Sequence, residues 1–101
     1  MPHPDKDEAQ EWVASEIARL RGTTFRDLLP MVDNPIHHRV PSRTGRVLMG
    51  ETSVFDLPGE PEWLQVTVDI CEPQPGVAHA IAEQTLFVAV NGSVTDQSPL
   101  E

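Results

Sequence analysis

The sequence predicts an α+β fold in which an N-terminal helix packs on a three- to four-stranded antiparallel sheet arranged as a meander. Two observations favour this fold. Residues 62–71, EWLQVTVDIC, alternate apolar and polar side chains at a period of two, as in a strand that is covered on one face. Residues 6–21 carry an apolar stripe at helical spacing, and this helix is the natural cover for the apolar side of the strand.

The N-terminal helix is expected over residues 6–21. Asp5 or Asp7 can cap its start, and Gly22 follows its end as a C′ residue. Glu16 falls near the middle of the apolar stripe. We interpret it as a boundary residue whose carboxylate reaches solvent or an arginine, and a catalytic or ligand-binding carboxylate is the alternative. The stripe itself consists of Ala9, Trp12, Val13, Ile17 and Leu20.

A short helical turn is expected at residues 25–29, after Thr23 or Thr24 as a cap and before Pro30, which ends it. Residues 30–45 then contain prolines, two adjacent histidines and little periodicity. They predict a long loop that is either mobile or functional, part of which pairs at the edge of the sheet.

Two strands are expected at residues 46–55 and 62–71, joined as a hairpin by a turn at Pro58-Gly59. Gly50 is interpreted as a bulge or as a point where another group approaches the backbone closely. Residues 77–84 are expected to form a strand, with a helix as the alternative. Residues 86–90 are either a fourth strand or a segment packed under the sheet.

The chain length of 101 residues fits one small domain covering 1–101. Residues 1–5 and 94–101 are expected to be flexible, and residues 100–101 resemble a vector-derived remnant. Cys71 is the single cysteine, which excludes an intramolecular disulfide and suits a reducing compartment. No secretory signal or membrane-length apolar run is visible, so a cytoplasmic location is expected.

The formal charge of −9 is distributed unevenly. Residues 1–46 hold all seven basic side chains and seven acidic ones, so they balance. Residues 47–101 hold nine acidic side chains and no lysine or arginine. Such a half repels nucleic acid and anionic lipid, so neither a nucleic-acid nor a membrane partner is expected.

Several short motifs follow one another along most of residues 16–93. In their order the chain resembles a family of small uncharacterised bacterial proteins. The resemblance implies an α+β fold and no assigned activity. The residues that carry it are Leu20-Arg21-Gly22, Thr24-Phe25 with Leu28, Phe55-Asp56 with Pro58-Gly59, Val66 to Ile70, and Phe87-Val88 with Asn91-Gly92-Ser93.

The sequence contains no catalytic motif, no metal-ligating spacing and no phosphate-binding glycine loop, so we expect no catalytic residue, metal or cofactor. Glu16, His37, His38 and His79 are the candidates to line a pocket. The leading hypothesis is a small acidic, non-enzymatic protein-interaction or accessory module, monomeric or homodimeric, with a protein partner. The alternative is a small-molecule-binding or hydrolase-like protein, whose pocket lies between the helix and the sheet and is gated by residues 30–45.

Overall fold

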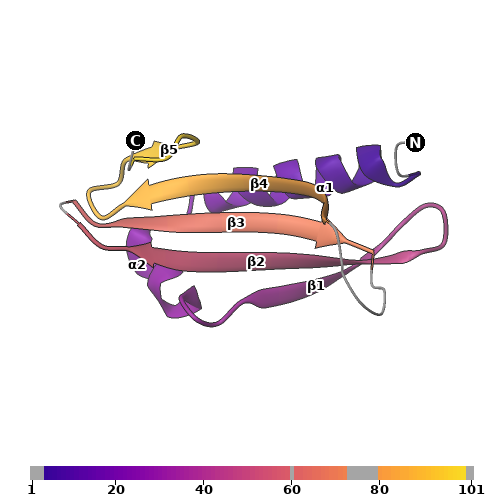
Figure 1. Cartoon of the computed structure of the whole chain (residues 1–101), viewed down its shortest axis with the longest axis horizontal. Coiled ribbons are helices and arrows are strands. Elements are labelled where there is room, and N and C mark those ends of the chain that lie inside the picture. The colour runs from indigo at the N-terminus through magenta and orange to yellow at the C-terminus, as the bar shows by residue number, and fades with distance from the viewer. Residues whose placement is uncertain (1–3, 60, 73–79, 100–101) are drawn as a thin grey trace.

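The computed structural model describes residues 4–59, 61–72 and 80–99 (Figure 1). Its strands form one antiparallel sheet in the order β1-β2-β3-β4-β5, so neighbours in the sheet are also neighbours in the chain. The α+β class and the meander are therefore confirmed, with five strands rather than three to four. The elements are α1 (Lys6–Leu20), α2 (Phe25–Leu28), the 3-10 helix η1 (Leu29–Met31), β1 (Ile36–Pro41), β2 (Val47–Leu57), β3 (Trp63–Cys71), β4 (Ala80–Ala89) and β5 (Val94–Thr95).

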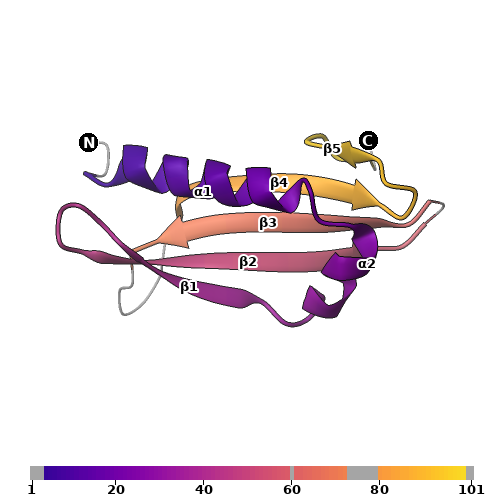
Figure 2. The same ribbon diagram turned by 180° about the vertical axis from the view of Figure 1, so that it is seen from behind.

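The hydrophobic core lies between α1 and one face of the sheet (Figure 2). Helix α1 runs mainly along β4 and β3, and Phe25 and Leu28 of α2 fill the space beyond its C-terminal end. Strand β3 supplies every second side chain to this core, as its alternation predicts. The largest fully buried apolar side chains of the strands are Leu48, Leu64, Val66, Val68, Ile70, Leu86 and Val88.

The additional strands come from segments with weak sequence signals. Residues 36–41, inside the expected loop, pair with β2 as strand β1. Their side chains are mostly exposed or half-buried because β1 is an edge strand, so no apolar alternation marks it. Val94 and Thr95, expected to be flexible, pair with Val88 and Phe87 as β5.

The course of β4 decides between the alternatives left open for residues 77–84 and 86–90. Pairing with β3 runs from Cys71–Ala80 to Trp63–Ala89, so a helix is wrong for residues 80–84, while residues 77–79 lie outside the described residues. The segment 86–89 continues the same strand and does not lie under the sheet. Cross-strand pairing here outweighs the helical preference of alanine and glutamate.

The segment after α1 follows its expected course except at Pro30. Thr24 caps α2, and its Oγ1 accepts a hydrogen bond from the Asp27 N–H at 3.1 Å. Pro30 does not end the helical segment but lies inside η1. Proline is compatible with the first positions of a helical turn, where its missing N–H has no intrahelical partner to lose.

Polar contacts attach the turn between β1 and β2 to the N-terminal end of α1. Asp5, expected to lie in a flexible end, is only 1% exposed. The hydroxyls of Ser42 and Thr44 both donate to its Oδ1. The backbone N–H of Arg43 donates to the Glu8 carboxylate at 3.1 Å. The helix and the first hairpin are therefore held together at this end by hydrogen bonds as well as by the core.

Candidate functional site

The face of the sheet opposite α1 carries no helix of the described chain (Figures 1 and 2). Residues on it alternate with the core residues along β2 and β3. We call this surface the open face. Its side chains include His37 and Arg39 from β1, Val47, Met49, Glu51, Ser53 and Phe55 from β2, Trp63, Gln65, Thr67, Asp69 and Cys71 from β3, and Glu83, Thr85 and Phe87 from β4.

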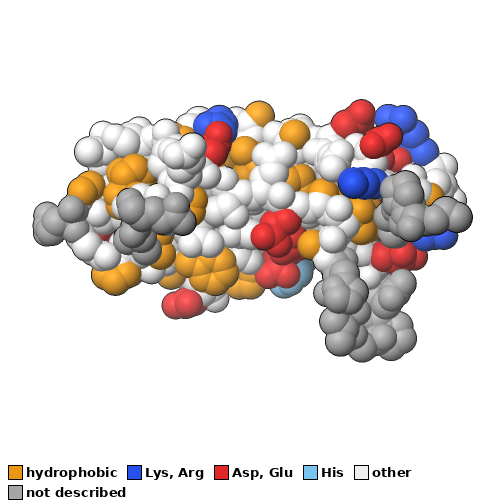
Figure 3. Space-filling model, turned by 45° about the horizontal axis from the view of Figure 1, so that its top comes forward, with side chains coloured by type: hydrophobic (Ala, Val, Ile, Leu, Met, Phe, Trp, Pro, Cys, Tyr) orange, Lys and Arg blue, Asp and Glu red, His pale blue; other side chains and the backbone are white. Residues whose placement is uncertain are grey.

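A row of three carboxylates crosses the middle of the open face. The strand register places Glu51 directly opposite Asp69, and Asp69 directly opposite Glu83. His37 pairs with Glu51 from the other side, and its Nε2 lies 3.6 Å from Glu51 Oε2. Figure 3 shows the acidic side chains gathered on this face with a histidine beside them. We call Glu51, Asp69 and Glu83 the carboxylate row.

The carboxylate row changes the acidity of the groups within it. Burial, followed by the charges of Glu51 and Glu83, raises the pKa of Asp69 above 3.8, and His37 acts in the opposite direction. Burial and then Asp69 and Glu51 raise the pKa of the Cys71 thiol above 9.0. Cys71 is therefore kept as a thiol at neutral pH, which makes it a weak nucleophile.

Chemically, the carboxylate row can attract cationic groups. A hollow of about 330 Å³ lies against it, lined by all three carboxylates with Cys71 and Ala80. Within the described ranges, no three histidine, cysteine, aspartate or glutamate side chains are grouped so that they could hold a metal ion. The site suits the ammonium or guanidinium groups of a larger partner.

Apolar side chains flank the carboxylate row along β2. Phe55 is 51% exposed and Val47 is 38% exposed, although both lie within β2 rather than in a loop. Trp63, at the start of β3, is half-buried. Hydrophobic side chains beside the acidic ones are visible in Figure 3. Aromatic groups next to charged ones are typical of surfaces that bind other proteins.

Two predicted pocket residues lie near each other, Glu16 on α1 and His38 on β1. Glu16 is bound by Arg19, whose Nε and Nη2 donate to its carboxylate at 3.1 and 2.9 Å. This bond, more than the smaller charge effect of His38, lowers the pKa of Glu16 although burial opposes it. Glu16 is thus a boundary residue that reaches an arginine, as interpreted from the sequence.

His38 packs against Trp12 rather than facing an enclosed cavity. The two ring centroids lie 5.3 Å apart at an interplanar angle of 63°. Its Nε2 is buried and has no hydrogen-bond partner among the residues described. The hollows in this part of the molecule are lined by other residues. His37 points to the open face instead, and His79 lies outside the described residues.

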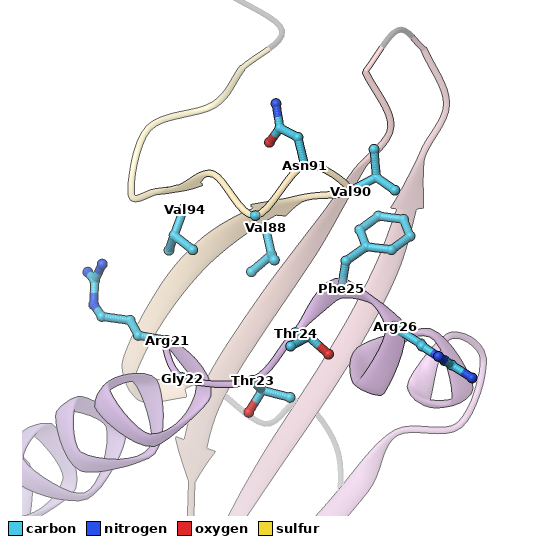
Figure 4. Close-up of a pocket in the computed structure, with 11 residues that line it drawn as sticks. Arg21, Gly22, Thr23, Thr24, Phe25, Arg26, Val88, Val90, Asn91 and Val94 are labelled. Carbon is cyan, nitrogen blue, oxygen red and sulfur yellow. The ribbon is translucent and has the colours of Figure 1, made fainter.

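A larger hollow, of about 410 Å³, lies at the far end of the molecule between the α1–α2 corner and the β4–β5 turn (Figure 4). Phe25, Val88 and Val94 come together in it from three elements. Arg21 and Arg26 leave it on opposite sides, and Arg21 forms an ion pair with Asp96. We call this cavity the end hollow.

Sequence reasoning did not find the carboxylate row. Its members are separated by 18 and 14 positions, so no local motif contains two of them. The alternation of β2 and β3 does predict that Glu51 and Asp69 avoid the core, but only the register places them opposite each other.

Comparisons with known proteins add no relative. Neither models of protein families, nor curated proteins, nor solved structures gave a match to this chain. The resemblance to a bacterial family therefore stays an expectation from the sequence. No helix in the described part of the chain is long and apolar enough to span a membrane.

Proposed function

We propose that this chain is a small, acidic, non-enzymatic interaction or accessory module that binds a protein partner on the open face. The observation that carries the proposal is the combination of the carboxylate row with exposed Phe55 and Val47 on a sheet face without a covering helix. Exposed apolar groups beside charged ones distinguish a binding surface from an ordinary solvated sheet.

Charge determines the kind of partner that this proposal requires. Residues 47–101, which supply most of the open face, contain no lysine or arginine. A partner surface with lysine or arginine at its centre and apolar groups on either side would complement it, whereas nucleic acid would be repelled. The free Cys71 thiol suits the reducing cytoplasm as the place of action.

Several features favour binding over catalysis. The raised pKa of Cys71 disfavours the thiolate that a nucleophile needs. Glu16 is engaged by Arg19, and His38 packs on Trp12, so these groups do not converge on a space that a substrate would enter.

Affinity capture from the native cell tests the proposal. The wild-type chain is compared with the triple variant Glu51→Gln, Asp69→Asn, Glu83→Gln, which removes the charge of the carboxylate row and keeps the side-chain sizes. We expect a specific partner that the wild type retains, and at least a tenfold lower recovery with the variant, about 1.4 kcal/mol.

A matched control removes three acidic groups away from the open face: Asp7→Asn, Glu11→Gln and Asp56→Asn. Asp7 and Glu11 lie on α1, and Asp56 alternates to the other side of β2 from Glu51. This variant should retain the partner like the wild type. Equal recovery by the two triple variants, or no specifically retained protein, would contradict the proposal.

The end hollow favours a second candidate function, the binding of a small apolar molecule. Its volume of about 410 Å³ is within the range of ligand sites, and Phe25, Val88 and Val94 give it an apolar lining. Nuclear magnetic resonance shifts measured with a library of small apolar probes should cluster at these residues. The variant Val94→Trp, which fills the hollow, should abolish those shifts, and shifts that persist in the variant would exclude this site.

A further inference from the structure

The outer edge of β1 has no strand partner among the described residues. Strand β1 stands first in the sheet order and pairs with β2 on one side only. An edge of this kind presents unpaired backbone N–H and C=O groups to solvent, where another strand can add to the sheet. The edge is distinct from the open face, so its role goes beyond the proposed function.

The register shows which backbone groups of β1 face outward. The Ser42 N–H donates to the Arg46 carbonyl at 2.8 Å, so backbone groups at this position point toward β2. Hydrogen-bonded positions alternate along an antiparallel pair, which places those of Val40, His38 and Ile36 toward β2 as well. The backbone groups of His37 and Arg39 then face outward. Pro41 fits this alternation because its missing N–H would also point outward.

We propose that a second copy of this chain pairs with β1 in antiparallel orientation, with His38 on the two-fold axis. His37 of one copy then lies opposite Arg39 of the other, and this pair occurs twice. Each pair exchanges two N–H···O=C bonds, so four backbone hydrogen bonds join the copies. The two five-stranded sheets become one continuous sheet of ten strands.

The side chains of β1 are complementary to their own copy in this register. On the helix side, Ile36 is 42% exposed, and it would lie opposite the half-buried Val40 of the second copy. Pairing therefore covers an exposed apolar side chain with another apolar side chain. The twofold symmetry repeats this contact on the other side of the axis.

On the open-face side of β1, the charged side chains of the two copies are complementary. Arg39 is exposed and makes no ion pair with a described residue in one copy. In the pair it would lie beside His37 of the other copy, one strand away from Glu51. The carboxylate row of each copy would thus gain a guanidinium at its β1 end. The charges on the two copies attract across the edge, although each chain carries a net charge of −9.

Two prolines flank the outward donors of β1. Pro35 precedes β1 and Pro41 ends it, so His37 and Arg39 carry the outward N–H groups between them. The side chains select the register. A shift by two residues would separate Ile36 from Val40 and Arg39 from His37. The paired segment is short, so the dimer should be weak and dependent on concentration.

Cross-linking tests the axis directly. In a Cys71→Ser background, His38→Cys places two thiols on the axis at a non-hydrogen-bonded pair, where Cα atoms are about 4.5 Å apart and a disulfide can form. Mild oxidation should convert most of this variant to a covalent dimer. His37→Cys is the matched control, because its two copies are offset by two residues and about 8 Å apart, beyond disulfide reach.

A second experiment tests the outward backbone N–H groups of β1 without introducing a cysteine. Arg39→Pro removes the outward N–H and leaves the β1–β2 bonds intact, whereas Arg39→Ala removes only the charge. Light scattering should show a mass that rises from 11.2 kDa toward twice that value with concentration in the wild type, and a fixed 11.2 kDa in Arg39→Pro. Arg39→Ala should dimerise more than Arg39→Pro does.

Two results would overturn the dimer: a wild-type mass of 11.2 kDa up to about 1 mM, or equal cross-linking of the His38→Cys and His37→Cys variants. Neither experiment involves the carboxylate row or a foreign protein, so a failure here is distinguishable from a failure of the proposed function.

Discussion

Thr52 shows how a single buried side chain can limit the stability of this sheet. It is 1% exposed in the middle of β2, opposite Val68 of β3. Its Oγ1 is buried and finds no hydrogen-bond acceptor or donor within the described chain. A hydroxyl that is removed from water without gaining a hydrogen-bond partner destabilises the folded state. This loss of stability comes from the hydroxyl group and not from the shape of the side chain.

Thr52→Val should therefore stabilise the protein. Valine has nearly the same shape, so the packing is kept while the unpaired hydroxyl is removed. We expect the free energy of unfolding to rise by about 1 kcal/mol in urea denaturation. Thr67→Val is the control, since Thr67 lies on the open face with the Thr85 hydroxyl 3.5 Å away. A loss of stability in Thr52→Val would mean that its hydroxyl is in fact satisfied.

Asp69→Asn should also stabilise the protein at neutral pH. The raised pKa of Asp69 shows that its ionised form is disfavoured in the folded sheet, first by burial and then by Glu51 and Glu83. Removing the charge should raise the free energy of unfolding by about 0.5 kcal/mol, the scale of one cross-strand charge pair at a partly exposed site.

The gain from Asp69→Asn should depend on pH in a defined direction. Above the raised pKa the carboxylate is ionised in both the folded and unfolded states, so its cost is fully present. As the pH falls through the raised pKa toward 3.8, the folded wild type takes up the proton first and the cost is removed. The advantage of the variant should thus disappear below 3.8. An advantage that persists there would assign the effect to something other than charge.

For single residues, the sequence predicts whether a side chain is buried or exposed better than it predicts which residues the side chain contacts. The helical wheel identified Glu16 as a boundary residue, and Arg19 at i+3 is its partner. His38 could not be placed against Trp12 in advance, because that contact depends on how α1 lies across the sheet. The carboxylate row likewise depends on two strand registers, β2 with β3 and β3 with β4, that no local pattern specifies.

Among the elements, α1 approaches the sheet closely at one glycine. Gly50 lies under Trp12, and a Cβ built at Gly50 would lie 2.8 Å from Trp12 Cζ3 and 2.9 Å from Cζ2. The glycine is thus a site of close approach, one of the two roles expected for it. The absence of a side chain in β2 makes room for the indole of the helix.

Gly50→Ala should push the indole away and destabilise the protein by about 1–3 kcal/mol, measured by urea denaturation. In a Trp12→Leu background the smaller side chain leaves room for the new methyl group. There the cost of Gly50→Ala should fall close to zero or become a gain. An equal loss in the free energy of unfolding in both backgrounds would show that the Trp12 indole is not what disfavours a side chain at position 50.

Elements with a strong internal pattern were predicted with their bounds. At the edges, pairing of part of residues 30–45 was expected and is confirmed by β1, but its bounds and the strand β5 were not predicted. The helix at 6–21 is confirmed as α1, and the strand at 62–71 as β3, because both bury one continuous face. Strand β1 is exposed at the edge and β5 has only two residues, so neither has a pattern of its own. The alanines of β4 favour a helix locally, and only β3 as a neighbour makes them a strand.

For the whole molecule, the central claim is that the helices of the described chain cover one face of the sheet and leave the other open. The elongated shape, 44 × 24 × 23 Å, follows from one helix lying along long antiparallel strands. With one covering layer, half of the sheet surface remains for binding, and the acidic half of the sequence supplies most of it. Both the proposed partner and the carboxylate row depend on this one-sided arrangement.

The most direct test places a lysine on each face of β3. Val68 is fully buried under α1, and Thr67 next to it is on the open face, close to Asp69 and the Thr85 hydroxyl. Urea denaturation of Val68→Lys should show a loss of more than about 3 kcal/mol or no folded state, because an unpaired charge would enter the core. Thr67→Lys should stay within about 0.5 kcal/mol of the wild type. Equal losses at the two positions would contradict the account, because both faces would then be covered.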